Sequence, residues 1–468
     1  MSLQFSNVNE NIYDIRSKLN NFSLNNIMWS SLFSGMGIIN PLTEKDVERF
    51  FKLNKSDNNT KDLLSNYVPI KCIYAKGHPI FVNPPVEILN PGKYMWDFDS
   101  FDRSISLSAQ AFLILDLCIA AELLYESSIT DGLIALKSAR LIYDFISTYL
   151  RNEDGLFVNG VDKTKDFEKD LKIKISSKKV NLYEQILVFE ASLYLHNVSC
   201  DEYYKEYKTS KSETFINEAL SLFDYIHNNY QLLFDLSTKD IALSISSLSR
   251  CCSITADTKL KENLRFLIFN LMCELEARIV ITGEVKDDLD RDVTSSVISH
   301  FKVYSAMLEG FMQIGVEKFK DIAERIYNTI LDLYDPALGL FLMKDYNHIS
   351  YTISDIAEII KSFLLNEMIY KNSNSLETLR SFYDFSIDRS GIVQSIVKKI
   401  INSNSMDIIL GEHIPLMDEI NKAPIFLKNL KFKISKKNTT YEISKSYNSL
   451  YGLYASYLFL FYFNKPLT

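Results

Sequence analysis

Long amphipathic segments separated by short polar breaks make up most of this chain from residue 104 onward. In these segments apolar residues recur at spacings of three and four, the pattern by which an α-helix presents one face to a core. The chain has only 14 glycines and 10 prolines in 468 residues. A turn-rich β-protein, or a doubly wound sheet with glycine-rich loops, needs more of both, so the pattern predicts an all-α fold.

The predicted helices fall into six pairs. Within a pair the break is usually short, as at 128–131 and 314–316, and between pairs it is longer. Two of the longer breaks, 154–157 and 338–341, share a Gly-Leu-Phe signature. Such a repeat cannot bury its apolar face alone, so the units must stack or close on themselves. The pairs are 104–127 with 130–151, 181–198 with 211–234, 238–252 with 257–281, 293–314 with 316–334, 349–371 with 375–386, and 390–403 with 446–463.

This organisation resembles the six-hairpin, or (α/α)6 toroid, proteins over residues 101–468. They include many glycoside hydrolases and sugar epimerases and, as a related half-fold, the terpenoid cyclases. The resemblance rests on the six hairpins and the Gly-Leu-Phe loops, and it implies an all-α toroid. Residues 1–100 hold short helical segments and a proline-rich stretch, and are expected to form a lead-in that packs on the toroid. Alternation at about 423–444 predicts a small inserted β-hairpin.

Two similar aspartate-rich segments, 96–104 and 287–295, precede the first and fourth predicted inner helices. Because the inner helices of a toroid begin at one end, the residues just before them would ring one funnel. Opposed carboxylates in a cleft can act as general acid and base. We therefore expect Asp99 and Asp290 to be the catalytic pair of a glycoside hydrolase. The expected substrate-binding residues at the same end are Trp96, Asp97, Phe98, Asp102, Arg103, Tyr183, Glu184, Asp292, Tyr351 and Asp355, and Asp240 and Glu358 are further candidates there.

Other interpretations of these residues stay open. Aspartate before a helix is an ordinary N-cap, so a non-catalytic toroid that binds a glycan or a protein partner fits as well. Residues 290–294 are similar to the Asp-x-Asp-Asp-Thr motif of protonating terpenoid cyclases, except that Val293 stands where the last aspartate belongs. His300 and His348 flank the fourth and fifth inner helices and would serve as acid and base in a sugar epimerase.

The expected partner is a small molecule or a glycan, and neither nucleic acid nor a membrane is expected. The formal net charge is −8 with no basic stripe, which argues against nucleic acid. No basic start with an apolar run opens the chain, and the most apolar stretch, 109–124, contains Asp116 and Glu122, so neither a signal nor a membrane span is expected.

Six cysteines without CxxC spacing are typical of buried thiols in a cytoplasmic protein. No cofactor is expected. The alternating aspartates at 288–292 lack the glycine and glutamate of a calcium loop, so no metal is expected either.

Overall fold

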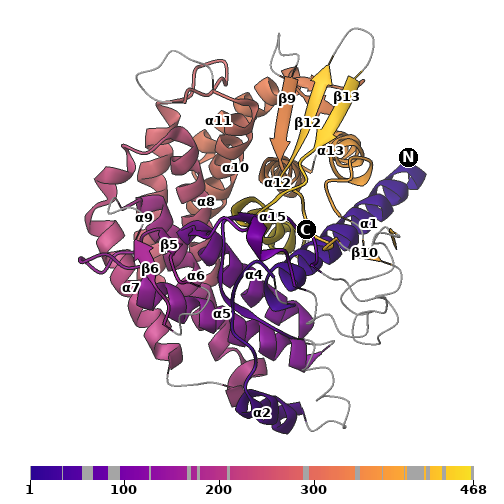
Figure 1. Cartoon of the computed structure of the whole chain (residues 1–468). Helices are drawn as coiled ribbons and strands as arrows, with labels where there is room; N and C mark the ends of the chain where they lie inside the picture. The colour runs from indigo at the N-terminus through magenta and orange to yellow at the C-terminus, as the bar shows by residue number, and fades with distance from the viewer. Residues whose placement is uncertain are drawn as a thin grey trace.

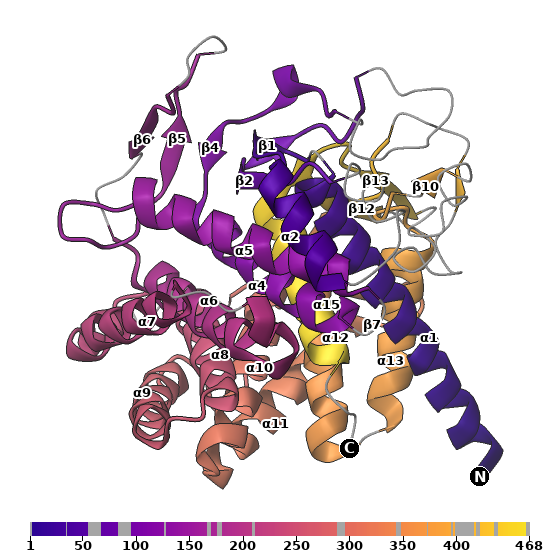
Figure 2. The ribbon, with the colours of Figure 1, turned by 90° about the horizontal axis from the view of Figure 1, so that it is seen from below.

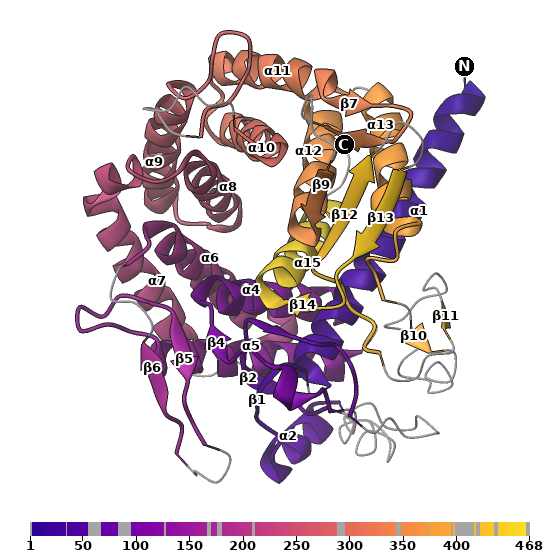
Figure 3. The ribbon, with the colours of Figure 1, turned by 45° about the horizontal axis from the view of Figure 1, so that its top comes forward.

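The computed structural model is a closed ring of helical hairpins (Figure 1, Figure 3). Each inner helix contacts the next one along the chain, and the last returns to contact the first. The inner helices are α4 (Leu107–Leu124), α6 (Leu182–Cys200), α8 (Thr238–Ile254), α10 (Val297–Ile314), α12 (Ile353–Tyr370) and α15 (Ser449–Phe463). The predicted (α/α)6 toroid is confirmed. The structure describes residues 2–33, 35–54, 67–82, 95–125, 128–165, 170–175, 180–207, 211–287, 295–342, 348–371, 373–394, 396–397, 416–417, 422–434 and 439–464.

A second layer of helices packs outside the inner ring. Five of these helices contact the inner helix that precedes them in the chain. They are α5 (Ile129–Tyr149), α7 (Lys211–Asn228), α9 (Thr258–Glu276), α11 (Glu317–Asp332) and α13 (Ser373–Tyr383). The two layers explain the difference in sequence pattern: α4 is buried on all sides, whereas α11 exposes a charged face. By length and composition α4 would also span a membrane, and 89% of that span is buried inside the ring.

The sixth outer place belongs to α1 (Ser2–Ile27), which contacts α15 and α13 (Figure 2). The prediction that 390–403 pairs with the last helix is therefore wrong. The described part of that segment forms a turn and the short strand β10 (Ile396–Val397) instead of a helix. The apolar face of α1 explains the placement, since Ile12, Ile15 and Leu19 are all buried. The division of the chain at residue 100 stays a prediction.

Short β-elements decorate the ring. The largest sheet joins β9 (His348–Thr352), β12 (Asn429–Ile434) and β13 (Thr439–Ile443), all antiparallel. The pairing of β12 with β13 confirms the predicted β-hairpin. The remaining elements are β1 (Gly37–Ile39), β2 (Ile70–Ile73), β3 (Lys76–Gly77), β4 (Ser104–Ile105), β5 (Gly160–Asp162), β6 (Ile173–Ile175), β7 (Tyr334–Asp335), β8 (Leu340–Phe341), β11 (Leu416–Met417), β14 (Tyr447–Asn448), α2 (Glu44–Asn54) and the short helices η1 (Met28–Leu32), η3 (Phe98–Ser100), η4 (Glu202–Tyr207), η5 (Tyr230–Leu233) and η6 (Asp384–Asp388).

Side-chain caps set where the inner helices begin. Five of the six inner helices start with a polar residue whose side chain accepts a hydrogen bond from a backbone N–H of the first turn. Strand β4 ends just before one of these caps, and β9 and β14 end at two others. The first turns are thereby held in register at one end of the ring. The capping residues are Ser106, Asn181, Ser237, Thr352 and Asn448.

Candidate functional site

A cavity of about 250 Å³ lies at the end of the ring where the inner helices begin. Every inner helix contributes to its wall. This volume is near the lower end of small-molecule sites, roughly 300–1,000 Å³, and suits a ligand of about one ring. The lining residues are Ser108 and Phe112 from α4, Asn181, Tyr183 and Glu184 at the start of α6, Asp240 and Leu243 from α8, Lys302 from α10, Ser354 from α12, and Leu450, Tyr451 and Tyr454 from α15.

Glu184 is the carboxylate that the cavity wall holds most firmly. Ser108 Oγ donates to its Oε1 at 3.1 Å. Asn159 Nδ2 lies 3.3 Å from Oε1 and 3.2 Å from Oε2. Burial raises the pKa of Glu184, the bonds from Asn159 and Ser108 oppose that effect, and the charge of Asp240 adds to it. A carboxyl group in this environment keeps its proton to higher pH than a free one, as a general acid requires.

Asp240 faces the same cavity from the first turn of α8. Ser237 Oγ donates to Asp240 Oδ2 at 2.9 Å, and the Asp240 N–H donates to Ser237 Oγ at 3.2 Å. Asp240 is half-buried, and its charge contributes to the raised pKa of Glu184. An acid with a raised pKa beside a second carboxylate in the same cavity is the pattern that acid and base pairs use.

Aromatic rings form the rest of the wall. Phe112 packs on Tyr454 with ring centroids 4.9 Å apart. Tyr183 and Tyr451 line the cavity beside them. These rings would give a sugar an apolar face to lie on while the polar groups meet its hydroxyls.

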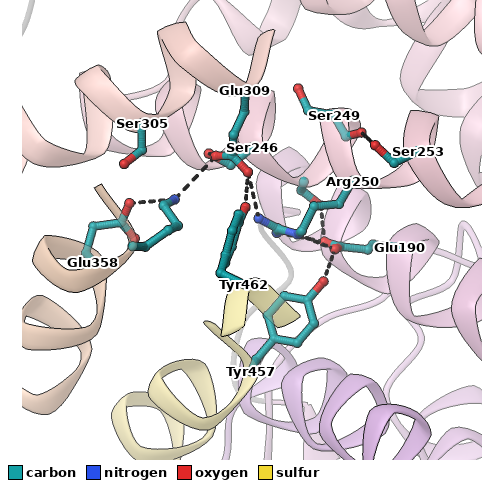
Figure 4. A network of polar contacts seen from close by, with 12 residues as sticks. Glu190, Ser246, Ser249, Arg250, Ser253, Ser305, Glu309, Glu358, Tyr457 and Tyr462 are labelled. Carbon is teal, nitrogen blue, oxygen red and sulfur yellow. Dashed lines mark hydrogen bonds and ion pairs between the residues drawn. The ribbon is translucent and has the colours of Figure 1, made fainter. Parts of the chain in front are cut away.

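A network of buried charged groups occupies the ring axis below the cavity (Figure 4). Tyr454, which lines the cavity, donates its phenol hydrogen to Glu358 Oε2 at 2.5 Å. Lys361 Nζ lies 2.6 Å from Glu358 Oε1 and 3.3 Å from Glu309 Oε2. Burial alone would raise the pKa of Glu309, but the charges of Lys361 and Arg250 outweigh it and hold that pKa below the usual value.

The network also separates the cavity from the other end of the ring. Arg250, Glu309 and Tyr462 line a second, smaller cavity of about 20 Å³ near the C-terminal ends of the inner helices. Tyr462 donates to Glu309 in the same network. The main cavity therefore ends on a polar floor, and the axis is not an open channel between the two cavities.

Of the residues predicted from the sequence, Tyr183 and Glu184 line the cavity, and so does the further candidate Asp240. Near Asp355 the cavity is lined by the preceding residue, Ser354. Asp290 and Asp292 lie outside the described residues. Asp355 forms a capping box with Thr352 and is not part of the lining. Tyr351 is buried among aromatic rings, where it donates to the Phe341 carbonyl.

The first aspartate-rich segment lies in and beside η3 and does not contribute to the cavity lining. Asp99 is exposed, and Asp97 caps η3 by accepting from the Asp99 N–H at 3.2 Å. Phe98 is 47% exposed and packs edge-on against Phe101. Trp96 is fully buried and its indole packs edge-on against a tyrosine of β14.

Asp102 and Arg103 have structural partners. Asp102 Oδ1 accepts from the Ser104 N–H at 3.1 Å. Arg103 pairs with buried Asp162 at 2.6 Å, and that carboxylate also accepts from the Tyr74 hydroxyl at 2.5 Å. The segment thus fastens the start of α4 to the preceding loops.

The two histidines of the epimerase hypothesis are not brought together in the cavity. His300 is buried with its Nε2 accepting from the Val285 N–H at 3.2 Å and its Nδ1 3.1 Å from the Ser296 carbonyl oxygen. Burial lowers its pKa. His348 is exposed on β9.

Several cavity residues were not predicted. Lys302 and Tyr454 lie in the second turn of their helices, one turn beyond the positions that the funnel argument considered. Residues one helical turn apart lie on the same face of a helix, so extending the funnel argument by one turn would have included both. Asn159 comes from a loop, and no local pattern connects it with Glu184.

Comparison with known proteins gives matches in three dimensions but not in sequence. No sequence profile of a known protein family matches this chain, and no curated protein matches it by sequence. A cellobiose 2-epimerase from Bacillus thermoamylovorans superposes with a TM-score of 0.51 at 11% identity, over 90% of this chain and 99% of that one. A D-mannose isomerase gives 0.51 at 11% identity, over 89% and 97%.

A cellobiose 2-epimerase from Spirochaeta thermophila gives a TM-score of 0.50 at 11% identity, over 77% of this chain and 87% of that one. At such identities the likeness concerns the fold and not the activity. This chain is therefore a six-hairpin (α/α)6 toroid, with the fold that sugar epimerases and isomerases of known structure share.

Proposed function

We propose that this protein is a carbohydrate-active enzyme that hydrolyses a glycosidic bond in the cavity at the start of the inner helices. The observation that carries the proposal is the pairing of Glu184, half-buried, hydrogen-bonded to two side chains and with a raised pKa, with the carboxylate of Asp240 in one aromatic-lined cavity. The sugar substrates named for the structures of the same fold are consistent with it.

In this proposal Glu184 is the general acid. It donates its proton to the glycosidic oxygen as the bond to the anomeric carbon breaks, so that the leaving sugar departs as a neutral alcohol. Asp240 then either takes a proton from the attacking water or attacks the anomeric carbon itself. A carboxyl separation of roughly 6.5–9.5 Å gives inversion, and one of about 5–5.5 Å gives retention. The anomer that appears first in the product, followed by NMR, distinguishes the two routes.

The polar floor favours action at the end of a chain. Tyr454 and Glu358 close the cavity from below, so a polysaccharide cannot thread through the ring. A ligand therefore enters from the open end and reaches the carboxylates with its terminal residue. Release of single sugars, and not of mid-chain fragments, is the expected product pattern.

The test is a screen of oligosaccharides and aryl glycosides with wild-type protein and two variants, Glu184→Gln and Asp240→Asn. Each variant is expected to lower turnover by at least about a hundredfold, the usual contribution of one acid or base, while leaving the thermal midpoint nearly unchanged. Asp131→Asn is a matched control, because Asp131 is a buried carboxylate in a helix first turn that accepts from Tyr67 at 2.6 Å and has a raised pKa, but lies on an outer helix.

Activity that survives in Glu184→Gln, or that falls equally in Asp131→Asn, would contradict this assignment. Running the same sugars in deuterated water adds a second readout. Incorporation of deuterium on a sugar carbon without bond cleavage would show an epimerase or isomerase in place of a hydrolase.

A further inference from the structure

Lys302 is the one cationic side chain in the cavity lining among the described residues. It comes from the second turn of α10 and is half-buried. Within the described part of the chain it makes no hydrogen bond or ion pair, although two carboxylates line the same cavity. An ammonium group held partly out of water without a counterion gains from any anion that enters beside it.

Both carboxylates of the cavity have hydrogen-bond partners other than this lysine. Glu184 is in the first turn of α6 and accepts from Ser108 of α4, and in the ring α4 and α10 stand opposite one another (Figure 3). Asp240 is held at the cap of its own helix by Ser237. The cavity thus takes its carboxylates from α6 and α8 and its positive charge from α10.

The neighbouring helix adds a hydroxyl on the cationic side. Ser354 of α12 lines the cavity, and its Oγ lies 2.7 Å from Thr352 Oγ1 in a pair where either oxygen can be the donor. When Thr352 donates, the Ser354 hydrogen is free to point into the cavity. Lys302 and Ser354 together would offer an anion a charge and a directed hydrogen bond.

We propose that the substrate is a sugar that carries an anionic substituent, and that Lys302 recognises this group. The inference rests on the proposed function, because it places the sugar ring between Glu184 and Lys302. The orientation follows from charge: the anion is repelled by the carboxylate of Asp240 and attracted by Lys302, so the glycosidic oxygen is left on the side of the protonated Glu184, where protonation occurs. A carboxylate on the ring and a sulfate ester present the same chemistry to a lysine.

The experiment is calorimetric titration of the wild-type protein with matched monosaccharides. Glucuronate and galacturonate form the carboxylate arm, glucose 6-sulfate forms the sulfate arm, and glucose and galactose are neutral controls of the same ring configuration. At least one anionic sugar is expected to bind about tenfold more tightly than its neutral counterpart at low salt, and the difference should shrink as NaCl rises. The arm that shows the preference identifies the anion.

Lys302→Met keeps the aliphatic stem and removes the charge, so it should abolish the preference for the anionic sugar over its neutral counterpart. Lys302→Arg should restore part of it. Lys318→Met on α11 is the control, since this lysine is exposed and pairs with Glu276 at the surface, and it should change nothing.

Three results would overturn the inference. Equal binding of neutral and anionic sugars by the wild type, together with hydrolysis that depends on Glu184, would reject the anionic substrate and leave the proposed function standing. A preference that persists in Lys302→Met would reject the role of this lysine. If no sugar binds and no hydrolysis depends on Glu184, the proposed function fails and the inference with it.

Discussion

Arg250 and Glu190 form a two-point ion pair between neighbouring inner helices, with Arg250 Nε 2.6 Å from Glu190 Oε1 and Nη2 3.0 Å from Oε2. Their side chains are 4% and 0% exposed. The pair connects α8 with α6, and Tyr457 of α15 donates to the same carboxylate at 2.5 Å. A buried charge is tolerated only when it is paired and hydrogen-bonded, so this contact fixes how three inner helices approach one another.

Arg250→Met is therefore expected to lower the free energy of unfolding by about 3–5 kcal/mol, because it leaves Glu190 charged and unpaired in the ring axis. Urea unfolding at pH 7 measures the loss. The double variant Arg250→Met with Glu190→Gln removes the stranded charge and should recover part of the stability. Strictly additive losses in the double variant would mean that the two residues do not act as a pair.

Asp116 should destabilise the fold as the pH rises. Its side chain is fully buried in α4, and neither carboxyl oxygen has a hydrogen-bond partner among the described residues. Burial raises its pKa well above the ordinary 3.8. Above that ordinary value the unfolded chain releases the proton while the folded chain keeps it. The free energy of unfolding then falls by up to about 1.4 kcal/mol per pH unit until the folded pKa is reached.

Asp116→Asn removes this titration and tests the sign. We expect wild type and variant to differ least below pH 4, and the variant to become progressively more stable than wild type between about pH 4 and the raised pKa. Chemical denaturation at several pH values supplies the comparison. A difference that does not change with pH would show that Asp116 has the same pKa in both states.

Asp355 provides a test between capping and binding. The Thr352 N–H donates to Asp355 Oδ2 at 2.9 Å, and the Asp355 N–H donates to Thr352 Oγ1 at 3.2 Å. Asp355→Ala should cost about 1 kcal/mol of stability through loss of this capping box, and leave sugar affinity unchanged. The thermal midpoint and a calorimetric titration check the two expectations. Lost affinity at unchanged stability would instead support the substrate-binding role predicted from the sequence.

The sequence was most informative where periodicity controls burial. Hairpins formed by consecutive helices follow from apolar spacing, and the first turns of inner helices follow from their capping residues, which is why Tyr183 and Glu184 were found. Carboxylates near a helix start were harder to assign, because a cap and a catalytic group share the same residue types. Asp97 and Asp102 bond to the backbone two residues on, whereas Glu184 bonds to side chains from distant segments.

Contacts between distant segments were beyond any local pattern. The final helix α15 is aromatic and apolar on all sides, so its sequence does not show that Tyr454 faces the cavity or that Tyr457 and Tyr462 face buried carboxylates. The pairing of the first helix with the last spans nearly the whole chain. Only closure of the ring brings them together.

That closure gives the last prediction, which concerns Asn26 at the end of α1. Asn26 is fully buried, its Nδ2 donates to Ser456 Oγ at 3.0 Å, and its Oδ1 accepts from the Phe426 N–H at 3.2 Å. Asn26→Ala removes both bonds and leaves a buried N–H unsatisfied, so the free energy of unfolding should fall by about 1–3 kcal/mol.

Asn20→Ala on the same helix is the control for this prediction. Asn20 is half-buried and its contact with Asn464 is a long 3.3 Å, so its loss should stay within about 0.5 kcal/mol. Because α1 completes the sixth hairpin, Asn26→Ala should shift the unfolding transition of the inner ring itself. Far-UV circular dichroism, which measures helix content, reports this transition. A transition that splits, with α1 melting first and the rest unmoved, would show that residues 1–100 fold as a separate lead-in and that the ring is stable without its first helix.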